Sequence, residues 1–205
     1  MIRIDTLNAI LNDQRGTAAE FALVLPIALL FFVGIMDAGL YAYTFNRGEK
    51  ATQIGARWAV VTDPLTPELA SKSYIGETVG GVRINQGDRI PAGALGEITC
   101  TSASCTCTTA PCPSSMTLDS DAFTALLSRM QDILPEIGTS NLIVEYTGSG
   151  LGYAGNPHGM DVAPFVTVRL QNMQYQSTLL FGAAVDLPDF SYTLTMEDGS
   201  GTGSN

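Results

Sequence analysis

The sequence predicts an α+β protein in which a long, membrane-spanning amino-terminal helix continues into a small domain with an antiparallel sheet. Three observations predict this fold class. Residues 21–45 form an apolar stretch whose only charged side chain is Asp37. Apolar residues at helical spacing follow it, and short segments near the carboxyl end alternate as strands do. We therefore expect a helix first and a sheet later in the chain.

The length of the apolar stretch determines its role. At 1.5 Å per residue, residues 21–45 make a helix of about 37 Å, which crosses a lipid bilayer with some tilt. A cleaved secretory signal is the alternative, with Arg3 and Arg15 as its basic region. The stretch is long for such a signal, and no small-x-small cleavage triplet follows in residues 36–45. We therefore expect the lipid bilayer as a partner.

Composition and charge restrict the remaining chain. The 205 residues include 20 acidic and 10 basic side chains, a formal charge of −10, so the chain repels phosphate backbones and nucleic acid is not an expected partner. Without the leader and the whole long helix, roughly 140 residues remain, the size of one small domain. Charged residues make up only 15%, which favours an exported, sheet-based domain.

The helix is expected to continue past the apolar stretch. Ile54, Trp58 and Val61 recur at helical spacing and define one apolar face. A stop is expected at residues 62–64, because the residue before Pro64 is pushed out of helical geometry. The first half of this helix would lie in lipid or among like helices, and the second half would pack on a domain.

Two carboxylates on this helix need an explanation. Asp37 lies about two-thirds of the way along the apolar stretch, where a charge is costly unless it is near the headgroups or paired. We expect interfacial placement; packing against a partner's basic residue is the alternative. Glu20 stands at the start of the stretch and needs a positive partner. Arg15 is one candidate, and the amino group of Thr17, freed by cleavage after Gly16, is another.

The same region carries a resemblance to a known family. Residues 15–61 resemble the amino-terminal signature of TadE-like pseudopilins, minor pilin-like subunits of the tight-adherence (Flp) pilus machinery. The matching residues are Arg15-Gly16, Glu20-Phe21-Ala22-Leu23, Leu25-Pro26, Asp37, and Ala51 with Gly55-Ala56-Arg57. Glu20 follows Gly16 by four residues, whereas the glutamate of a pilin-type processing site usually follows by five.

The resemblance implies a structural role in pilus assembly. It implies cleavage between Gly16 and Thr17 by a prepilin peptidase, and pairing with other pilins or pseudopilins through Glu20 and Phe21. The inner-membrane pilus assembly platform is a further implied partner. The chain would be a single-pass protein of the bacterial inner membrane, with a cytoplasmic amino terminus and a periplasmic domain, and would enter the pilus itself.

The expected organisation has four parts. Residues 1–16 are a cytoplasmic leader, 17–62 the transmembrane and amphipathic helix, 63–197 a periplasmic α+β domain, and 198–205 a flexible tail. Within the domain, short strands are expected at 80–84 and 96–102, a second helix within 117–138, and longer strands at 141–148, 163–173 and 189–197. Residues 178–188 are expected to form a short apolar excursion. The strands would form an antiparallel sheet against the long helix.

Four cysteines lie close together, at Cys100, Cys105, Cys107 and Cys112. They include no C-x-x-C pair and are far from the lone His158, so disulfides are expected and a metal site is not. Two pairings remain open: 100–105 with 107–112, or 100–107 with 105–112. Disulfides are typical of an oxidising compartment such as the periplasm, which orients the chain.

No catalytic constellation is visible. His158 lies in a turn-rich loop, and Ser149 lacks the G-x-S-x-G frame of a nucleophile elbow. We therefore expect neither an enzyme nor a cofactor. The first hypothesis is a membrane-anchored pilin-like subunit of a Tad/Flp-type pilus, processed by a prepilin peptidase. The alternative is a periplasmic binding domain on a plain anchor, with a ligand in the cell envelope.

Overall fold

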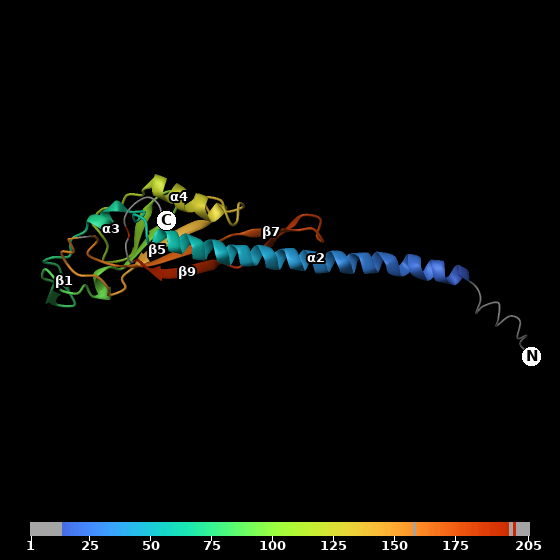
Figure 1. Cartoon of the computed structure of the whole chain (residues 1–205), viewed down its shortest axis with the longest axis horizontal. Coiled ribbons are helices and arrows are strands. Elements are labelled where there is room, and N and C mark those ends of the chain that lie inside the picture. Colours follow the sequence, from blue (N-terminus) through green and yellow to red (C-terminus); the bar gives the residue numbers. More distant parts are fainter. Residues whose placement is uncertain (1–13, 158, 197–198, 200–205) are drawn as a thin grey trace, which may run out of the picture. The chain divides into compact units, whose positions relative to one another are not determined.

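The computed structural model of the chain describes residues 14–157, 159–196 and 199, and it confirms the α+β class. Its elements are shown in Figure 1. In chain order they are α2 (Gln14–Ala59), α3 (Pro67–Ser71), β1 (Thr78–Val79), β2 (Val82–Arg83), the 3₁₀ turn η1 (Ala92–Ala94), β3 (Glu97–Cys100), β4 (Cys105–Thr109), α4 (Ser120–Gln131), β5 (Leu142–Thr147), β6 (Phe165–Leu170), β7 (Gln174–Ser177), β8 (Ala183–Asp186) and β9 (Phe190–Thr195).

The residues group into two compact units, and α2 contributes to both. The first unit contains Met1–Tyr43 and Tyr175–Val185. The second contains Thr44–Gln174 and Asp186–Asn205. Most of the apolar stretch of α2 thus belongs to the same unit as most of the β7–β8 hairpin, and the later turns of α2 belong to the unit that holds the large sheet.

The helix α2 runs without interruption for 46 residues, through Pro26, and ends close to the expected position. The Val60 amide still donates to the Ala56 carbonyl at 3.1 Å, but the Val61 amide donates to the Trp58 carbonyl at 3.2 Å, which tightens the last turn. The Thr62 hydroxyl donates to the same Trp58 carbonyl at 3.0 Å. These bonds satisfy the last carbonyls of the helix just before Pro64.

The core of the second unit is a five-stranded antiparallel sheet in the order β4-β3-β5-β6-β9. Its central pair is in register, with Val144 opposite Val168. Along β5 and β6 alternate side chains are buried, as period-two patterning predicts. The three longer strands expected from the sequence are therefore present as β5, β6 and β9, each shorter than its expected range.

One face of this sheet is covered by helices. A Cβ on Gly55 of α2 would lie 2.7 Å from the Met130 sulfur of α4 and 3.2 Å from a Val168 methyl of β6, so helix, helix and sheet meet at this glycine. Ala51 and Ala56, also on α2, are fully buried. Small residues let the helix backbone approach the sheet closely.

The helix α4 begins at a side-chain cap. The Asp119 carboxylate accepts hydrogen bonds from the amides of Asp121 and Ala122, both at 3.0 Å, which satisfies two orphan donors of the first turn. Its buried face consists of Phe123, Leu126, Leu127 and Met130. The helix ends at Gln131, before the expected Pro135, and tight turns carry the chain through buried Leu134 and Ile137.

The other face of the sheet carries polar pairs. Arg169 of β6 and Glu145 of β5 form a salt bridge of 2.9 Å. Hydroxyl groups pair between neighbouring strands at 2.8 Å for Thr167 with Thr193 and at 2.7 Å for Thr99 with Thr108. This polar face and the covered apolar face make a two-layer α+β unit.

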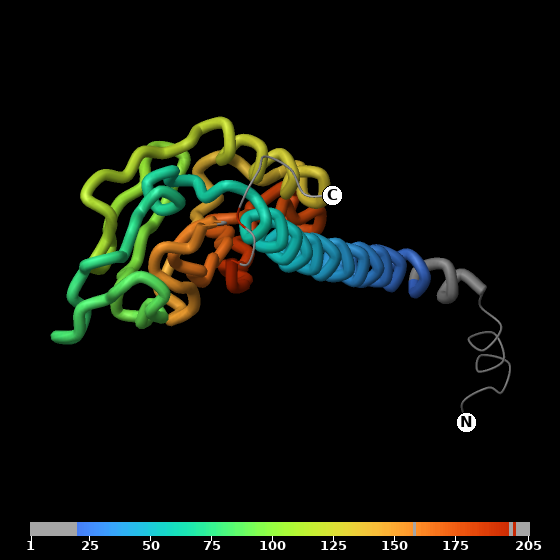
Figure 2. Tube along the Cα trace, turned by 60° about the vertical axis from the view of Figure 1, so that its left-hand side comes forward, coloured from blue at the N-terminus to red at the C-terminus, as the bar shows by residue number. Residues whose placement is uncertain are grey.

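A mostly irregular segment, residues 64–96, follows α2, and Figure 2 shows it in teal to green. Its strands β1 and β2 have two residues each, so the expected strand at 80–84 is only partly formed. The buried carboxylate of Asp161, which lies outside this segment, helps to hold it in place. Asp161 accepts bonds from the amides of Tyr74 at 2.9 Å, Gly155 at 2.8 Å and Asn156 at 3.0 Å, and so ties two loops together.

The β7–β8 hairpin, like α3 and β4, was not predicted from the sequence. Residues 178–188 were expected to form an apolar excursion, but β7 and β8 pair as a separate two-stranded sheet around the turn at 178–182. The Gly182 amide closes this turn by donating to the Ser177 carbonyl at 2.7 Å. Gly182 has a φ of +86°, a left-handed conformation that glycine adopts without strain.

Gly48 should be a sensitive packing position of the second unit. A Cβ there would lie 2.6 Å from the Phe190 ring of β9, whereas a Cβ on Gly39 of the same helix meets nothing within 4 Å. We expect Gly48→Val to lower the free energy of unfolding by about 1–3 kcal/mol through overpacking, and Gly39→Val to change it much less. Thermal unfolding of the full chain in detergent checks this. Equal effects of the two substitutions would contradict the packing argument.

Glu68 should make the stability of the second unit depend on pH in the acid range. Bonds from the Thr117 amide at 3.0 Å and the Thr117 hydroxyl at 2.8 Å lower the pKa of the Glu68 carboxyl from 4.5 to about 2. Since the folded pKa is the lower one, this stabilisation is present above pH 4.5 and is lost as the pH falls towards 2. Unfolding measured between pH 6 and 2 should therefore show a shallower loss of stability for Glu68→Gln than for the unchanged chain. Parallel curves would exclude this contribution.

Candidate membrane and assembly site

The apolar part of α2 exposes large hydrophobic side chains along its length. Phe21 is 65% exposed and Phe31 68%, and between Phe21 and Met36 most large apolar side chains are exposed in the same way. The segment Glu20–Ala59 is the one helix among the described residues that is long and apolar enough to cross a membrane. Such a surface is stable in hydrocarbon or against other apolar helices, and not in water.

The residues expected at the processing and pairing sites lie on the first turns of α2. Gly16 and Thr17 have helical backbone, and Glu20 and Phe21 are exposed. Among the side chains that the structure describes, Glu20 has no hydrogen bond or salt bridge, and the Arg15 side chain is not one of those described. The expected leader, residues 1–16, lies mostly outside the described part of the chain.

Asp37 is different, because it is nearly buried, with 9% of its surface exposed. Three donors from the β7–β8 hairpin surround its carboxylate. The Ser177 hydroxyl donates to Oδ2 at 2.5 Å, and the Tyr175 hydroxyl and the Thr178 amide each donate to Oδ1 at 2.8 Å. Each carboxylate oxygen therefore has at least one partner from the same chain, which removes the need for an outside cation.

Further contacts fix the hairpin on one face of α2. The Tyr41 ring packs edge-on against the Tyr175 ring, with centroids 5.7 Å apart. On the other side of Asp37, a Cβ on Gly34 would lie 3.8 Å from a Leu179 methyl. Residues 34, 37 and 41 share a helix face because they are three and four positions apart. The hairpin thus follows α2 over about two turns.

The sequence predicted interfacial placement of Asp37, with a basic residue of a partner as the alternative, and neither prediction included donors from the same chain. The structure instead gives the carboxylate neutral hydroxyl and amide donors. Tyr175 and Ser177 were not predicted as partners of Asp37, from which they are 138 and 140 residues distant in the sequence. The available signal was the run of donor side chains in residues 174–178, Gln-Tyr-Gln-Ser-Thr, directly before an apolar turn.

The cysteines form two disulfides, Cys100–Cys105 and Cys107–Cys112, which is the first of the two pairings left open. Cys100 and Cys105 are also cross-strand partners of β3 and β4, so that bridge closes the β-hairpin between them. Over the described residues, no group of three or more His, Cys, Asp or Glu side chains is arranged to hold a metal ion. His158 lies outside the described residues.

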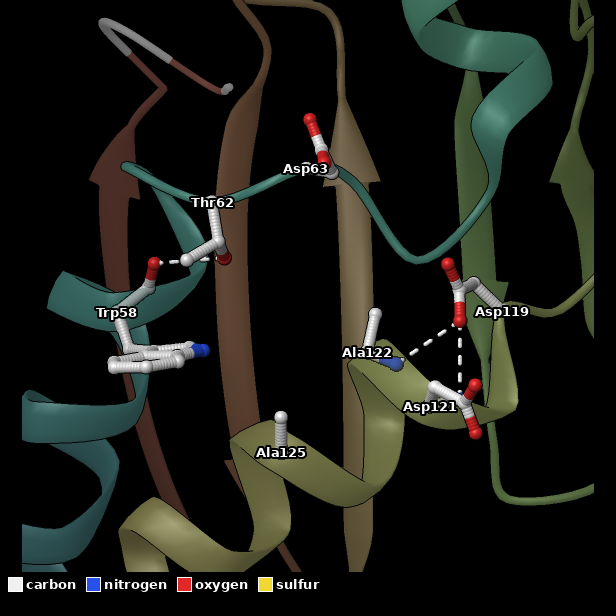
Figure 3. Close-up of a pocket in the computed structure, with 7 residues that line it drawn as sticks. All are labelled: Trp58, Thr62, Asp63, Asp119, Asp121, Ala122 and Ala125. Carbon is white, nitrogen blue, oxygen red and sulfur yellow. Dashed lines mark hydrogen bonds between the residues drawn. The ribbon is translucent and has the colours of Figure 1, made fainter. Parts of the chain in front are cut away.

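A pocket of about 400 Å³ lies between the end of α2 and the start of α4 (Figure 3). Trp58 lines it from α2, and Asp63, Asp119 and Asp121 bring carboxylates to it. Figure 3 shows that the Asp119 carboxylate points into the first turn of α4, where it caps the helix, and that Asp63 points away from it. The Asp119 carboxylate is thus engaged in capping α4.

Comparison with known proteins identifies the amino-terminal region. The family model described as TadE-like protein matches residues 16–57. The chain matches no curated protein and no solved structure. The matched segment coincides with nearly all of α2, from the expected processing site through Asp37 to the glycine that contacts the sheet. The resemblance seen in the sequence is therefore confirmed, and it indicates a membrane-anchored, pilin-like protein associated with Tad pili.

Asp37 should hold the hairpin on α2. In Asp37→Ala the Thr178 amide and the Tyr175 and Ser177 hydroxyls lose their acceptor, so we expect faster amide hydrogen exchange in residues 175–185. Hydrogen–deuterium exchange of the protein in detergent, followed by mass spectrometry, measures the exchange rate of these amides. The strands β5 and β6 serve as internal references. Glu49→Ala, which removes an exposed acid from the same helix, is the matched control and should leave the exchange unchanged. Unchanged exchange in Asp37→Ala would show that the carboxylate does not hold the hairpin.

Proposed function

We propose that this protein is a pilin-like structural subunit of a Tad/Flp-type pilus, cut by a prepilin peptidase and assembled through α2. The observation that carries the proposal is the coincidence of the TadE-like match, residues 16–57, with a helix whose apolar side chains are exposed. A helix that matches the family model and leaves most of its large apolar side chains between Phe21 and Met36 exposed needs lipid before assembly and other helices after it. Both surroundings are apolar, so the same surface serves both.

Glu20 provides the specific contact in this proposal. Apolar packing alone gives helices in lipid little preference for one register, since lipid is as apolar as a neighbouring helix. A carboxylate at the start of the apolar stretch changes this, because it is costly until it meets a positive charge. Cleavage after Gly16 would create such a charge on Thr17. Glu20 of one subunit and the amino group of Thr17 on the next would then set the stagger between their helices.

The cysteines support a periplasmic location for the second unit. Its two disulfides, Cys100–Cys105 and Cys107–Cys112, are typical of an oxidising compartment. With one span, the leader is then on the cytoplasmic side of the inner membrane, where a prepilin peptidase and the assembly platform would meet it. The assembly platform and sibling pilins are the partners that this orientation requires.

A structural role also agrees with the polar groups of the second unit. Asp119, Asp161 and Glu68 each bond to backbone amides within the domain, so their carboxylates hold loops and a helix start together. Such bonds stabilise the fold of the domain, which agrees with a structural role. An anchored periplasmic domain that binds an envelope ligand is the alternative, and it differs in one respect: a plain anchor has no use for Glu20.

Replacing Glu20 tests the proposal. We expect Glu20→Ala to insert into the membrane normally and to enter sheared pili, or to co-purify with sibling pilins, at about a tenth of the normal level or less, since a lost buried charge pair costs several kcal/mol. Immunoblots of membrane and pilus fractions measure both quantities. Glu49→Ala is the matched control, an exposed acid further along the same helix that should assemble normally. Normal assembly of Glu20→Ala would reject the charge-pair mechanism and favour the plain anchor.

A further inference from the structure

The turn of the β7–β8 hairpin presents an unusual apolar tip. Phe181 is 99% exposed and Leu180 54% exposed, and they are adjacent. Phe181 also has a φ of +56°, a left-handed conformation that bulky side chains rarely adopt. No charged residue occurs between Tyr175 and Val185. An aromatic residue held outward in this way indicates that something apolar covers it.

The position of the tip within the first unit indicates what covers it. Leu179 approaches Gly34, and Thr178 is bonded to Asp37, so the tip lies beside the lipid-exposed stretch of α2. A span of about 20 residues counted from Phe21 ends near Leu40. Gly34 lies six residues inside that end, or about 9 Å along the helix axis. Side chains that lie in a membrane interface reach a similar depth of about 5–10 Å.

The backbone of the tip is also suited to an apolar surrounding. A turn immersed in lipid must satisfy its own amides, because no water is available there. Five amides of the turn and its flank donate within the hairpin or to Asp37: Thr178 to the Asp37 carboxylate, Leu180 to the Ser177 hydroxyl, Phe181 to the Thr178 carbonyl, Gly182 to the Ser177 carbonyl and Ala183 to the Leu180 carbonyl.

We propose that residues 178–182 are a second membrane-contact element, which inserts Leu180 and Phe181 into the acyl region of the leaflet next to the carboxyl end of the span. Lipid is the occupant because the tip continues the exposed apolar surface of α2 and carries no charge. This inference rests on the proposed membrane anchoring by α2. Because Asp37 fixes the hairpin to one face of α2, a second insertion point would fix the rotation of the helix about its axis. Only the remaining faces of α2 would then meet neighbouring subunits.

Tryptophan quenching by brominated lipid tests this inference. Trp58 is the only tryptophan, so Trp58→Phe provides a silent background for three single probes: Phe181→Trp at the tip, Phe31→Trp on α2 and Tyr153→Trp on an exposed loop of the second unit. The full chain is reconstituted in phosphatidylcholine vesicles, with about one chain per vesicle, and compared with vesicles of acyl-chain-brominated phosphatidylcholine. We expect about a twofold or larger loss of emission for Phe181→Trp and Phe31→Trp, and almost none for Tyr153→Trp.

The three probes separate the possible failures. If Phe31→Trp is quenched and Phe181→Trp behaves like Tyr153→Trp, the helix spans the membrane but the tip does not enter it, and the inference is wrong. If Phe31→Trp is also unquenched, membrane anchoring itself fails. If Phe181→Trp becomes quenched only when many chains share a vesicle, a second copy brings the tip to lipid, and the single-chain insertion proposed is again rejected. Should Phe181→Trp disturb the turn, Leu180→Trp serves as the second probe at the same tip.

Discussion

One continuous helix has to satisfy two different surroundings, and this constraint shapes both units of the protein. The first part of α2 exposes Phe21, Phe31 and other large apolar side chains, which are stable only in lipid or among like helices. The later part carries Gly48, Ala51 and Gly55, which let the sheet and α4 approach its backbone. A helix with large side chains throughout would not allow this close packing. One with small side chains throughout would hold the bilayer weakly.

Asp37 shows how the first unit admits a charge on the apolar helix. An acid within an apolar span is costly unless it is paired or hydrogen-bonded. Here the hydroxyls of Tyr175 and Ser177 and the Thr178 amide provide the bonds, and all three come from one hairpin. The carboxylate is therefore satisfied before any partner arrives. Glu20 has no such enclosure among the described side chains, as the proposed contact with another subunit requires.

The sequence predicted the features that depend on local pattern. Hydrophobic periodicity placed α2, and it located α4 and the strands β5, β6 and β9 within a few residues, because their buried positions recur at fixed spacing. It also identified Asp37 and Glu20 as unusual. It could not identify the hairpin donors, since Tyr175 and Ser177 are distant in sequence and only the fold brings them to Asp37. The choice between two disulfide pairings likewise depended on the register of β3 and β4.

The amino terminus of the mature protein tests the central claim most directly. The proposed function requires α2 to be a processed, assembly-competent helix and not a permanent anchor. Sequencing the amino terminus of protein isolated from membranes, with and without the prepilin peptidase, distinguishes the two. We expect a start at Thr17 that requires the peptidase, despite the spacing of four residues between Gly16 and Glu20. A start at Met1 in both cells would contradict it and would leave an anchored periplasmic domain.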